Sequence, residues 1–238
     1  MVKFIKTKLN LLYRLSQPRF KNETKERFHQ YIDLVNNCAN GNEYEYSKSL
    51  IGIVVEYLNY KQAINSIEFE TSDQNNSHIE NIYNNLLKMI KQDCSDNKEV
   101  VIPINKYPIL LNPWEKQRII TNFININENN VFDGKKHSNN IHNHYLKPMN
   151  IVVCNNGNHS QLSARYKNSG ETIIKKIIDY SNLYEMFSFN GEDYINITTN
   201  EIIKFDNYDN EIIFYSGVIF ELGRFILNRE DCPSDNTL

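Results

Sequence analysis

The chain has 238 residues, of which 40% are hydrophobic, and its 15 tyrosines and 12 phenylalanines can fill a substantial core. Its formal net charge of −3, with acids and bases interspersed, excludes a global attraction to nucleic acid or anionic membranes and leaves only local basic patches. No stretch approaches the roughly 18 apolar residues that span a bilayer, and the four cysteines lack the paired spacing of a disulfide framework or zinc knuckle, so we expect a cytoplasmic protein without a membrane contact.

The chain up to residue 97 is predicted to be helical. Apolar residues recur there at helical spacing, and Pro18, Asn22 and the Asn40-Gly41 turn supply stop and start signals. The expected helices cover residues 4–15, 22–39, 46–58 and 77–90. The polar residues 70–77 are predicted to form a loop.

After residue 97 strands are expected among shorter helices. Residues 99–104 are strand-like, a helix is expected to start at Asn112-Pro113-Trp114, and residues 125–147 are predicted to be a long polar loop. Further strands or short helices and a terminal helix over 211–228 follow. We therefore predict an α+β protein with a helical N-terminal region (1–97), an α+β domain (98–228) and a flexible tail (229–238).

The most informative segment is the turn after Ile151-Val152-Val153-Cys154. This β-branched run stops at Asn155-Asn156-Gly157, and a segment of helix-forming character follows at once. Such a strand–turn–helix unit directs free backbone N–H groups and the positive end of the helix dipole at one point. Gly157 allows close approach to the backbone, Ser160 is a candidate helix cap, and His159 is a candidate proton carrier. The alternative is a plain Asn-Gly turn with a capped helix.

The stretch 100–171 resembles an uncharacterised bacterial family, a domain of unknown function with an Asn-Pro-Trp segment, an Asn-His pair and a Gly-Asn-His-Ser turn. More distantly, the turn resembles the ParB/sulfiredoxin fold, in which a Gly-x-His-Arg or Gly-x-Arg-Arg turn binds nucleotide phosphates at the start of a helix. This resemblance implies a mixed ParB/sulfiredoxin-like domain in which Gly157 and His159 match the family residues.

Two positions depart from that pattern. Asn158 stands where sulfiredoxins have their catalytic cysteine, which argues against sulfinic-acid reduction, and Ser160 replaces the phosphate-binding arginine. Arg165, about one helical turn later, is a candidate to compensate for that loss.

From the residues and the resemblance together we name three sets of candidates. The candidate catalytic residues are His159, His144 and Asp133. The candidate ligand-binding residues are Gly157, Asn158, Ser160, Arg165 and Asn143. The local bases that can hold phosphates are Lys116, Arg118, Lys147, Arg165 and Lys167.

Histidines gather before the turn and raise the question of a metal. His142 and His144 lie two residues apart, and together with His137 and His159 they offer a three-ligand set. Solvent-exposed histidines in an Asn-rich loop are the commoner situation, so we predict no metal site, and no cofactor can be named.

Three functions remain open. The first is binding, or hydrolysis, of a nucleotide or another phosphate-bearing ligand at the Gly157–Ser160 turn. The second is a non-catalytic protein–protein interaction module of a bacterial or phage conflict system, with the N-terminal helices as the binding face. The third, a nuclease acting through the histidine-rich loop, ranks lowest because no acidic residues are grouped near that loop.

Overall fold

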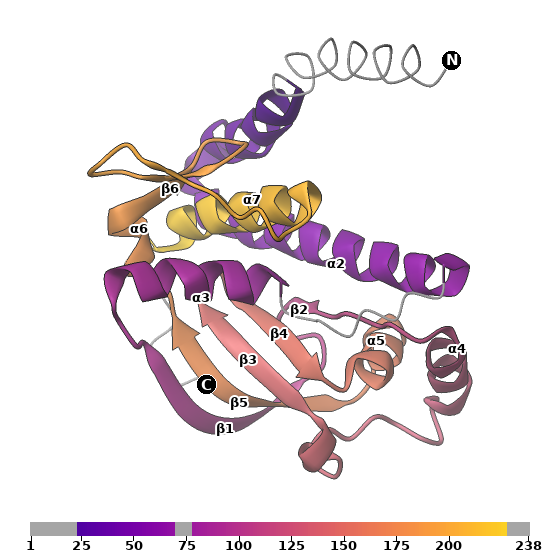
Figure 1. The fold of residues 1–238 in the computed structure, drawn as a ribbon. Coiled ribbons are helices and arrows are strands. Elements are labelled where there is room, and N and C mark those ends of the chain that lie inside the picture. The colour runs from indigo at the N-terminus through magenta and orange to yellow at the C-terminus, as the bar shows by residue number, and fades with distance from the viewer. Residues whose placement is uncertain (1–22, 70–77, 228–238) are drawn as a thin grey trace, which may run out of the picture.

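The computed structural model describes residues 23–69 and 78–227 (Figure 1). A first helix covers residues 23–36, and a 3₁₀ turn follows at Ala39–Gly41. The other helical elements are α2 (Glu43–Phe69), α3 (His78–Ile90), α4 (Lys116–Asn125), the 3₁₀ turn η2 (Ser138–Asn140), α5 (Asn158–Tyr166), α6 (Leu183–Met186) and α7 (Asn210–Leu227).

Within the described residues, eight strands form two sheets. Their bounds are β1 (Ser95–Pro103), β2 (Ile109–Leu110), β3 (His142–Lys147), β4 (Ile151–Asn156), β5 (Glu171–Asp179), β6 (Phe187–Phe189), β7 (Tyr194–Asn196) and β8 (Ile202–Ile203). The five-stranded sheet has the order β1-β5-β3-β4-β2, in which β5 with β3 and β4 with β2 are parallel and the other two pairs are antiparallel. The three-stranded sheet β6-β7-β8 is antiparallel.

The two faces of the five-stranded sheet belong to different hydrophobic clusters. Side chains alternate along β4, so that Ile151 and Val153 join the cluster shared with α2, α3 and α7, whereas Val152 and Cys154 join the cluster shared with α4 and α5. Helix α2 packs against α7, and α4 packs against α5 (Figure 1). The sheet therefore lies between two helical layers, and the turn after β4 leads into the layer that contains α5.

The α+β class is confirmed. The helix expected from Asn22 corresponds to residues 23–36, and the helix expected from Ser77 corresponds to α3, while α2 begins earlier and ends later than residues 46–58. The predicted helix 4–15, the loop 70–77 and the tail 229–238 lie outside the described residues. Since residues of α2 and α3 share one cluster with sheet residues such as Val153, the two predicted parts contribute to a common core.

Two expectations for the second half were wrong. Residues 142–147 are not loop but the strand β3, because they pair with β4 on one side and β5 on the other, and Tyr145 and Leu146 are buried. The helix expected at Asn112 starts only at Lys116, with the Glu115 carboxylate accepting a hydrogen bond from the Arg118 amide as its N-cap.

Candidate functional site

Helix α5 starts directly after β4 at a glycine in the left-handed region. Gly157 has φ +96°, and a Cβ atom there would lie 2.4 Å from Ile141 Cδ1, so both backbone and space require glycine. The first hydrogen bond of the helix runs from the Gln161 amide to the Gly157 carbonyl. The amides of Asn158, His159 and Ser160 precede that bond and have no acceptor within the helix. Ser160 is the third helical residue rather than the cap, and its hydroxyl donates to the Gly157 carbonyl at 3.2 Å.

A polar hollow of about 520 Å³ opens at this turn, and we call it the turn hollow. Its lining residues are Trp114, Arg118, Asn122, Asn140, Asn155, Asn156, Gly157, Asn158, His159 and Ser160. Arg118 brings a positive charge, and no carboxylate is among these lining residues. The turn hollow is therefore suited to an anion, and its many asparagine amides can both donate and accept hydrogen bonds.

Arg118 is held only loosely at the edge of the turn hollow. Its Nε lies 2.9 Å from a carboxylate oxygen of Glu115 on the same helical turn, and 62% of its side chain is exposed. Its guanidinium carbon lies 5.4 Å from the ring centroid of Trp114. An ion pair this exposed contributes little to stability, so Arg118 can turn toward a ligand at small cost.

The side chains of Asn158 and His159 point to a different task, because both hold the loop before α4. The Asn112 amide donates to Asn158 Oδ1 at 2.8 Å, and the Trp114 and Glu115 amides donate to His159 Nε2 at 3.2 and 3.1 Å. As an acceptor Nε2 carries no proton, so the His159 ring is neutral with its proton on Nδ1. Burial, helped by the charge of Arg118 and opposed by Glu115, lowers the pKa of His159 to about 4.

Helix α2 holds the other side of the same loop, through residues that sequence reasoning missed. Asn59 donates to the Ile109 carbonyl at 2.8 Å and accepts from the Leu111 amide at 2.7 Å, while Ser66 Oγ donates to the Pro113 carbonyl at 2.7 Å. Asn59 and Ser66 are both fully buried. Two polar residues seven positions apart in an otherwise apolar helix face were the available signal.

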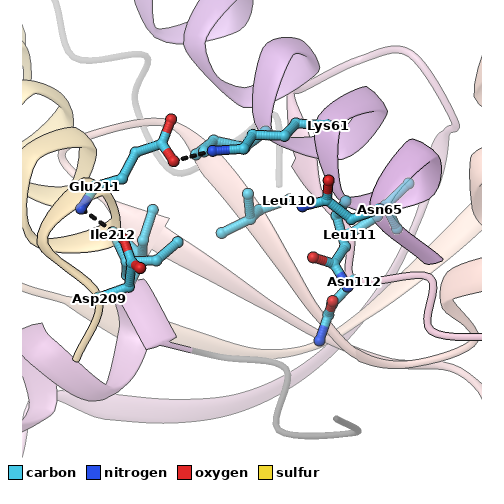
Figure 2. Close-up of a pocket in the computed structure, with 11 residues that line it drawn as sticks. Lys61, Asn65, Leu110, Leu111, Asn112, Asp209, Glu211 and Ile212 are labelled. Atoms are coloured by element: carbon cyan, nitrogen blue, oxygen red, sulfur yellow. Dashed lines mark hydrogen bonds and ion pairs between the residues drawn. The ribbon is translucent and has the colours of Figure 1, made fainter. Parts of the chain in front are cut away.

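A second hollow, of about 260 Å³, lies between α2, β2 and the start of α7 (Figure 2). Its wall includes Lys61, whose ammonium group is paired with the Glu211 carboxylate, and the apolar side chains of Leu110 and Ile212. Because the lining of this hollow includes the carboxylates of Asp209 and Glu211, whereas the lining of the turn hollow includes none, we place the candidate anion site in the turn hollow.

The structure separates His144 from Asn143, since neighbours on a strand face opposite sides of the sheet. His144 Nδ1 lies 2.8 Å from a carboxylate oxygen of Glu80 on α3. Asn143 is fully buried on the other face, where its amide donates to Gln161 and Thr172. Neither is among the lining residues of the turn hollow. Glu80, itself only 4% exposed, is a further residue that the sequence analysis missed.

Asp133 lines a neighbouring hollow of about 280 Å³, together with His137, and this hollow shares Gly157 and Ser160 with the turn hollow. The Asp133 carboxylate accepts a hydrogen bond from the Lys136 amide at 2.8 Å. Of the three candidate catalytic residues, His159 and Asp133 thus lie in adjoining hollows, while His144 lies on the opposite face of the sheet.

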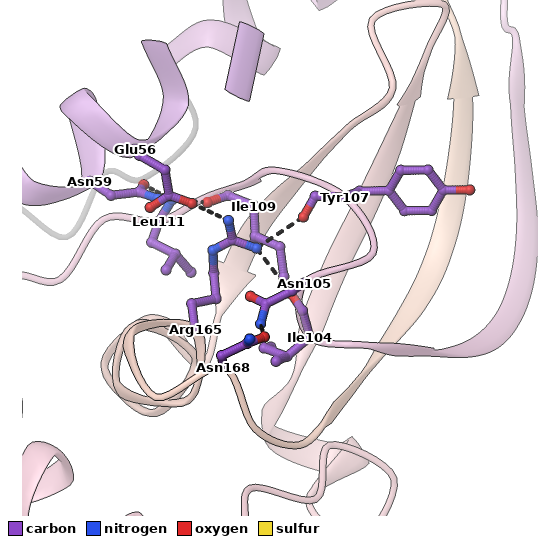
Figure 3. Close-up of polar contacts among 9 residues, drawn as sticks. All are labelled: Glu56, Asn59, Ile104, Asn105, Tyr107, Ile109, Leu111, Arg165 and Asn168. Carbon is purple, nitrogen blue, oxygen red and sulfur yellow. Dashed lines mark hydrogen bonds and ion pairs between the residues drawn. The ribbon is translucent and has the colours of Figure 1, made fainter. Parts of the chain in front are cut away.

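Arg165 does not reach the turn, because it sits at the far end of α5 (Figure 3). Its guanidinium group donates to the carbonyls of Ile104 at 3.0 Å and Tyr107 at 2.9 Å and forms an ion pair with Glu56. Only 12% of its side chain is exposed. Arg165 therefore fastens the segment before β2 to α5 and α2, and its predicted contact with a phosphate at the turn is not supported by this placement.

Within residues 23–69 and 78–227, no three His, Cys, Asp or Glu side chains are grouped as metal ligands. In the same ranges none of the helices combines the length and apolar character needed to cross a bilayer.

Comparison with known proteins gives one match. A family model described as "Family of unknown function (DUF6710)" matches residues 14–232, which is most of the chain. No curated protein and no solved structure matches the chain. The resemblance to the ParB/sulfiredoxin fold therefore stays a prediction.

Proposed function

The chain belongs to the DUF6710 family, whose function is unknown, and we propose that this protein binds a phosphate-bearing ligand of nucleotide type in the turn hollow. The observation that carries the proposal is the meeting of two positive groups at a hollow without carboxylates in its lining. These groups are the open N-terminus of α5 and the exposed guanidinium of Arg118. Both interact with anions, and the helix N-terminus does so without a conformational change.

The turn hollow also has features beyond an anion site. Its volume of about 520 Å³ falls within the range of small-molecule sites, roughly 300–1,000 Å³. The half-buried Trp114 offers an aromatic face, and the exposed Asn140 offers an amide that can pair with the polar edge of a base. In the proposed complex, the phosphate of the ligand accepts hydrogen bonds from the amides of Asn158 to Ser160, and its planar base lies near the Trp114 ring.

We propose binding and derive no hydrolytic step. His159 Nε2 already accepts two hydrogen bonds, and with a pKa of about 4 the ring is neutral at physiological pH. It therefore neither offers a positive charge to a phosphate nor takes up a proton efficiently. His159 supports the site indirectly, since it holds the loop that presents Trp114.

Calorimetric titration of the full chain with inorganic phosphate, AMP, ATP and adenosine tests the proposal. We expect saturable binding of the phosphate-bearing compounds, weakened about tenfold in Arg118→Ala, which corresponds to about 1.4 kcal/mol. Lys204→Ala is a matched control, because Lys204 is 57% exposed and forms a 2.9 Å ion pair with Asp193, as Arg118 does with Glu115. Absence of binding, equal affinity for adenosine and AMP, or an equal loss in both variants would contradict the proposal.

A further inference from the structure

Helix α2 carries a second apolar face that the protein's own core covers only in part. Its buried face includes Ile51, Val55 and Leu58. On the solvent side runs a row of large apolar residues that we call the α2 stripe: Tyr46, Leu50, Ile53, Tyr57, Tyr60, Ile64 and Ile67. Six members are exposed by 43–64%, and only Leu50 is half-buried.

The spacing of the α2 stripe is that of a coiled-coil seam. From Tyr46 to Ile67 the intervals alternate strictly between four and three residues, which is the a/d pattern of a heptad repeat. Such a row stays on one side of a helix over about 32 Å at 1.5 Å per residue, long enough to pack along a second helix. A face that only covers the protein's own core needs no such regular seam.

The exposed apolar area of the α2 stripe is also larger than that of isolated apolar residues on a protein surface. Aromatic side chains offer about 150–250 Å² each, so the three tyrosines at 43–44% exposure present roughly 200–330 Å². With the three isoleucines added, the α2 stripe reaches the size of the largest apolar patch on a typical monomer, roughly 300–600 Å², and such patches are often functional. Tyr57 is held in place, because its hydroxyl donates to Glu211 at 2.9 Å and its ring contacts Tyr215 on α7.

We infer that two copies of this chain pair through the α2 stripe as an antiparallel two-helix coiled coil. The sequence is self-complementary in the register centred on residue 55. There Tyr46 meets Ile64 of the second copy, and two further layers pair Leu50 with Tyr60 and Ile53 with Tyr57. Each layer thus combines one tyrosine with one aliphatic side chain, and the two-fold axis repeats all three layers. A parallel pair would instead stack Tyr57 and Tyr60 on their own copies.

In this register no charged residue of α2 lies level with another charge, although Glu43 lies level with Ile67 at the end of the α2 stripe. The helix has six charged residues: Glu43, Glu45, Lys48, Glu56, Lys61 and Glu68. In the antiparallel register the residues at the same level on the second copy are Ile67, Asn65, Gln62, Val54, Ser49 and Asn42, none of which is charged. In a parallel pair each charged residue lies level with its own copy, which sets like charges together. For a pair of two copies, the charges thus favour the antiparallel over the parallel arrangement.

Analytical ultracentrifugation of the full chain over a range of concentrations is the first test. We expect a concentration-dependent dimer that Ile53→Glu and Ile64→Glu each weaken at least about tenfold, since each buries a charge in the seam. Ile124→Glu is the matched control, because Ile124 is 68% exposed on α4, outside the α2 stripe, and should leave dimerisation unchanged. Thermal melting verifies that the three variants fold. The inference is overturned if the chain stays monomeric at the highest soluble concentration, or if Ile124→Glu weakens the dimer as much as the stripe variants do. In either case another segment or another protein covers the α2 stripe.

Disulfide trapping tests the direction of the pair. Mixing Tyr46→Cys with Ile64→Cys should give an oxidised dimer, whereas Tyr46→Cys alone should not, because its two copies lie about 27 Å apart along the helices. The wild-type chain, with its four cysteines, measures the background. Crosslinking of Tyr46→Cys with itself indicates a parallel pair and overturns the proposed register. This test is independent of the turn hollow, since no α2 stripe residue lines it.

Discussion

The two ends of helix α5 use their polar groups in opposite ways. At its C-terminal end the side chain of Arg165 is only 12% exposed, and its guanidinium group donates hydrogen bonds to two backbone carbonyls and pairs with Glu56. At its N-terminal end the first amides face an open hollow, and the nearby Arg118 is 62% exposed. The comparison teaches that a cation near a helix says little until its partners are known. The partners of Arg165 are buried within the fold, whereas Arg118 has only a solvent-exposed ion pair with Glu115.

The largest expected effect on stability is at the C-terminal end of α5, where Arg165 is buried. Arg165→Ala removes two buried charge-assisted hydrogen bonds and one ion pair, so we expect the free energy of unfolding to fall by about 3 kcal/mol. Urea unfolding measures this loss. Arg165→Lys should recover only part of it, because an ammonium group cannot reproduce the planar fork. A loss below about 1 kcal/mol, on the scale of surface substitutions, would show that the two ends do not differ.

The second effect concerns the inner side of the N-terminal end. His159→Ala leaves the amides of Trp114 and Glu115 without their acceptor, and we expect a loss of about 2 kcal/mol. His159→Gln, which keeps an acceptor atom, should lose less. Because Trp114 is the only tryptophan, its fluorescence reports on the loop directly. An unchanged emission spectrum and stability in His159→Ala would mean that this histidine does not support the loop.

Because the pKa of His159 is lowered in the folded state, we expect the free energy of unfolding to depend on pH. Its pKa is lowered from 6.5 to about 4 in the folded state, so between these values the unfolded chain binds a proton that the folded chain does not. The stabilising contribution of neutral His159 is therefore complete above pH 6.5 and is lost as the pH falls toward 4, by about 1.4 kcal/mol per pH unit. As the pH falls through this range, the stability advantage of the wild type over His159→Gln should shrink to zero and then reverse, because the variant lacks this titrating group. Parallel curves would contradict the assignment.

Much of the fold follows from local patterns. Apolar spacing predicted α3 and the helix over residues 23–36, and the β-branched run predicted β4, because in these segments period and burial agree. Helix α2 was predicted too short, since its apolar residues lie on two faces and blur a single stripe. The strand β3 was hidden by polar residues such as Asn143, whose burial depends on Gln161 and Thr172 from other elements.

The candidate site was only partly predictable. The turn itself follows from Gly157 and the strand before it. Strand alternation alone could have separated His144 from Asn143 once β3 was recognised. In contrast, the late start of α4 depends on His159, 44 residues away from Glu115, and the role of Arg165 depends on carbonyls of Ile104 and Tyr107. Contacts between segments this far apart in sequence leave no trace in local spacing.

The smallest expected effect on stability is at the N-terminal end of α5, where the polar groups face the turn hollow. Arg118→Ala should change the free energy of unfolding by less than about 0.5 kcal/mol, because its ion pair with Glu115 is solvent-exposed and local. Ser160→Ala should be similarly mild, since the lost hydrogen bond to the Gly157 carbonyl lies at a half-buried side chain. Chemical unfolding without added phosphate measures both. A loss near that of Arg165→Ala would mean that Arg118 is also part of the fold, and the turn would then have no side-chain cation available for a ligand.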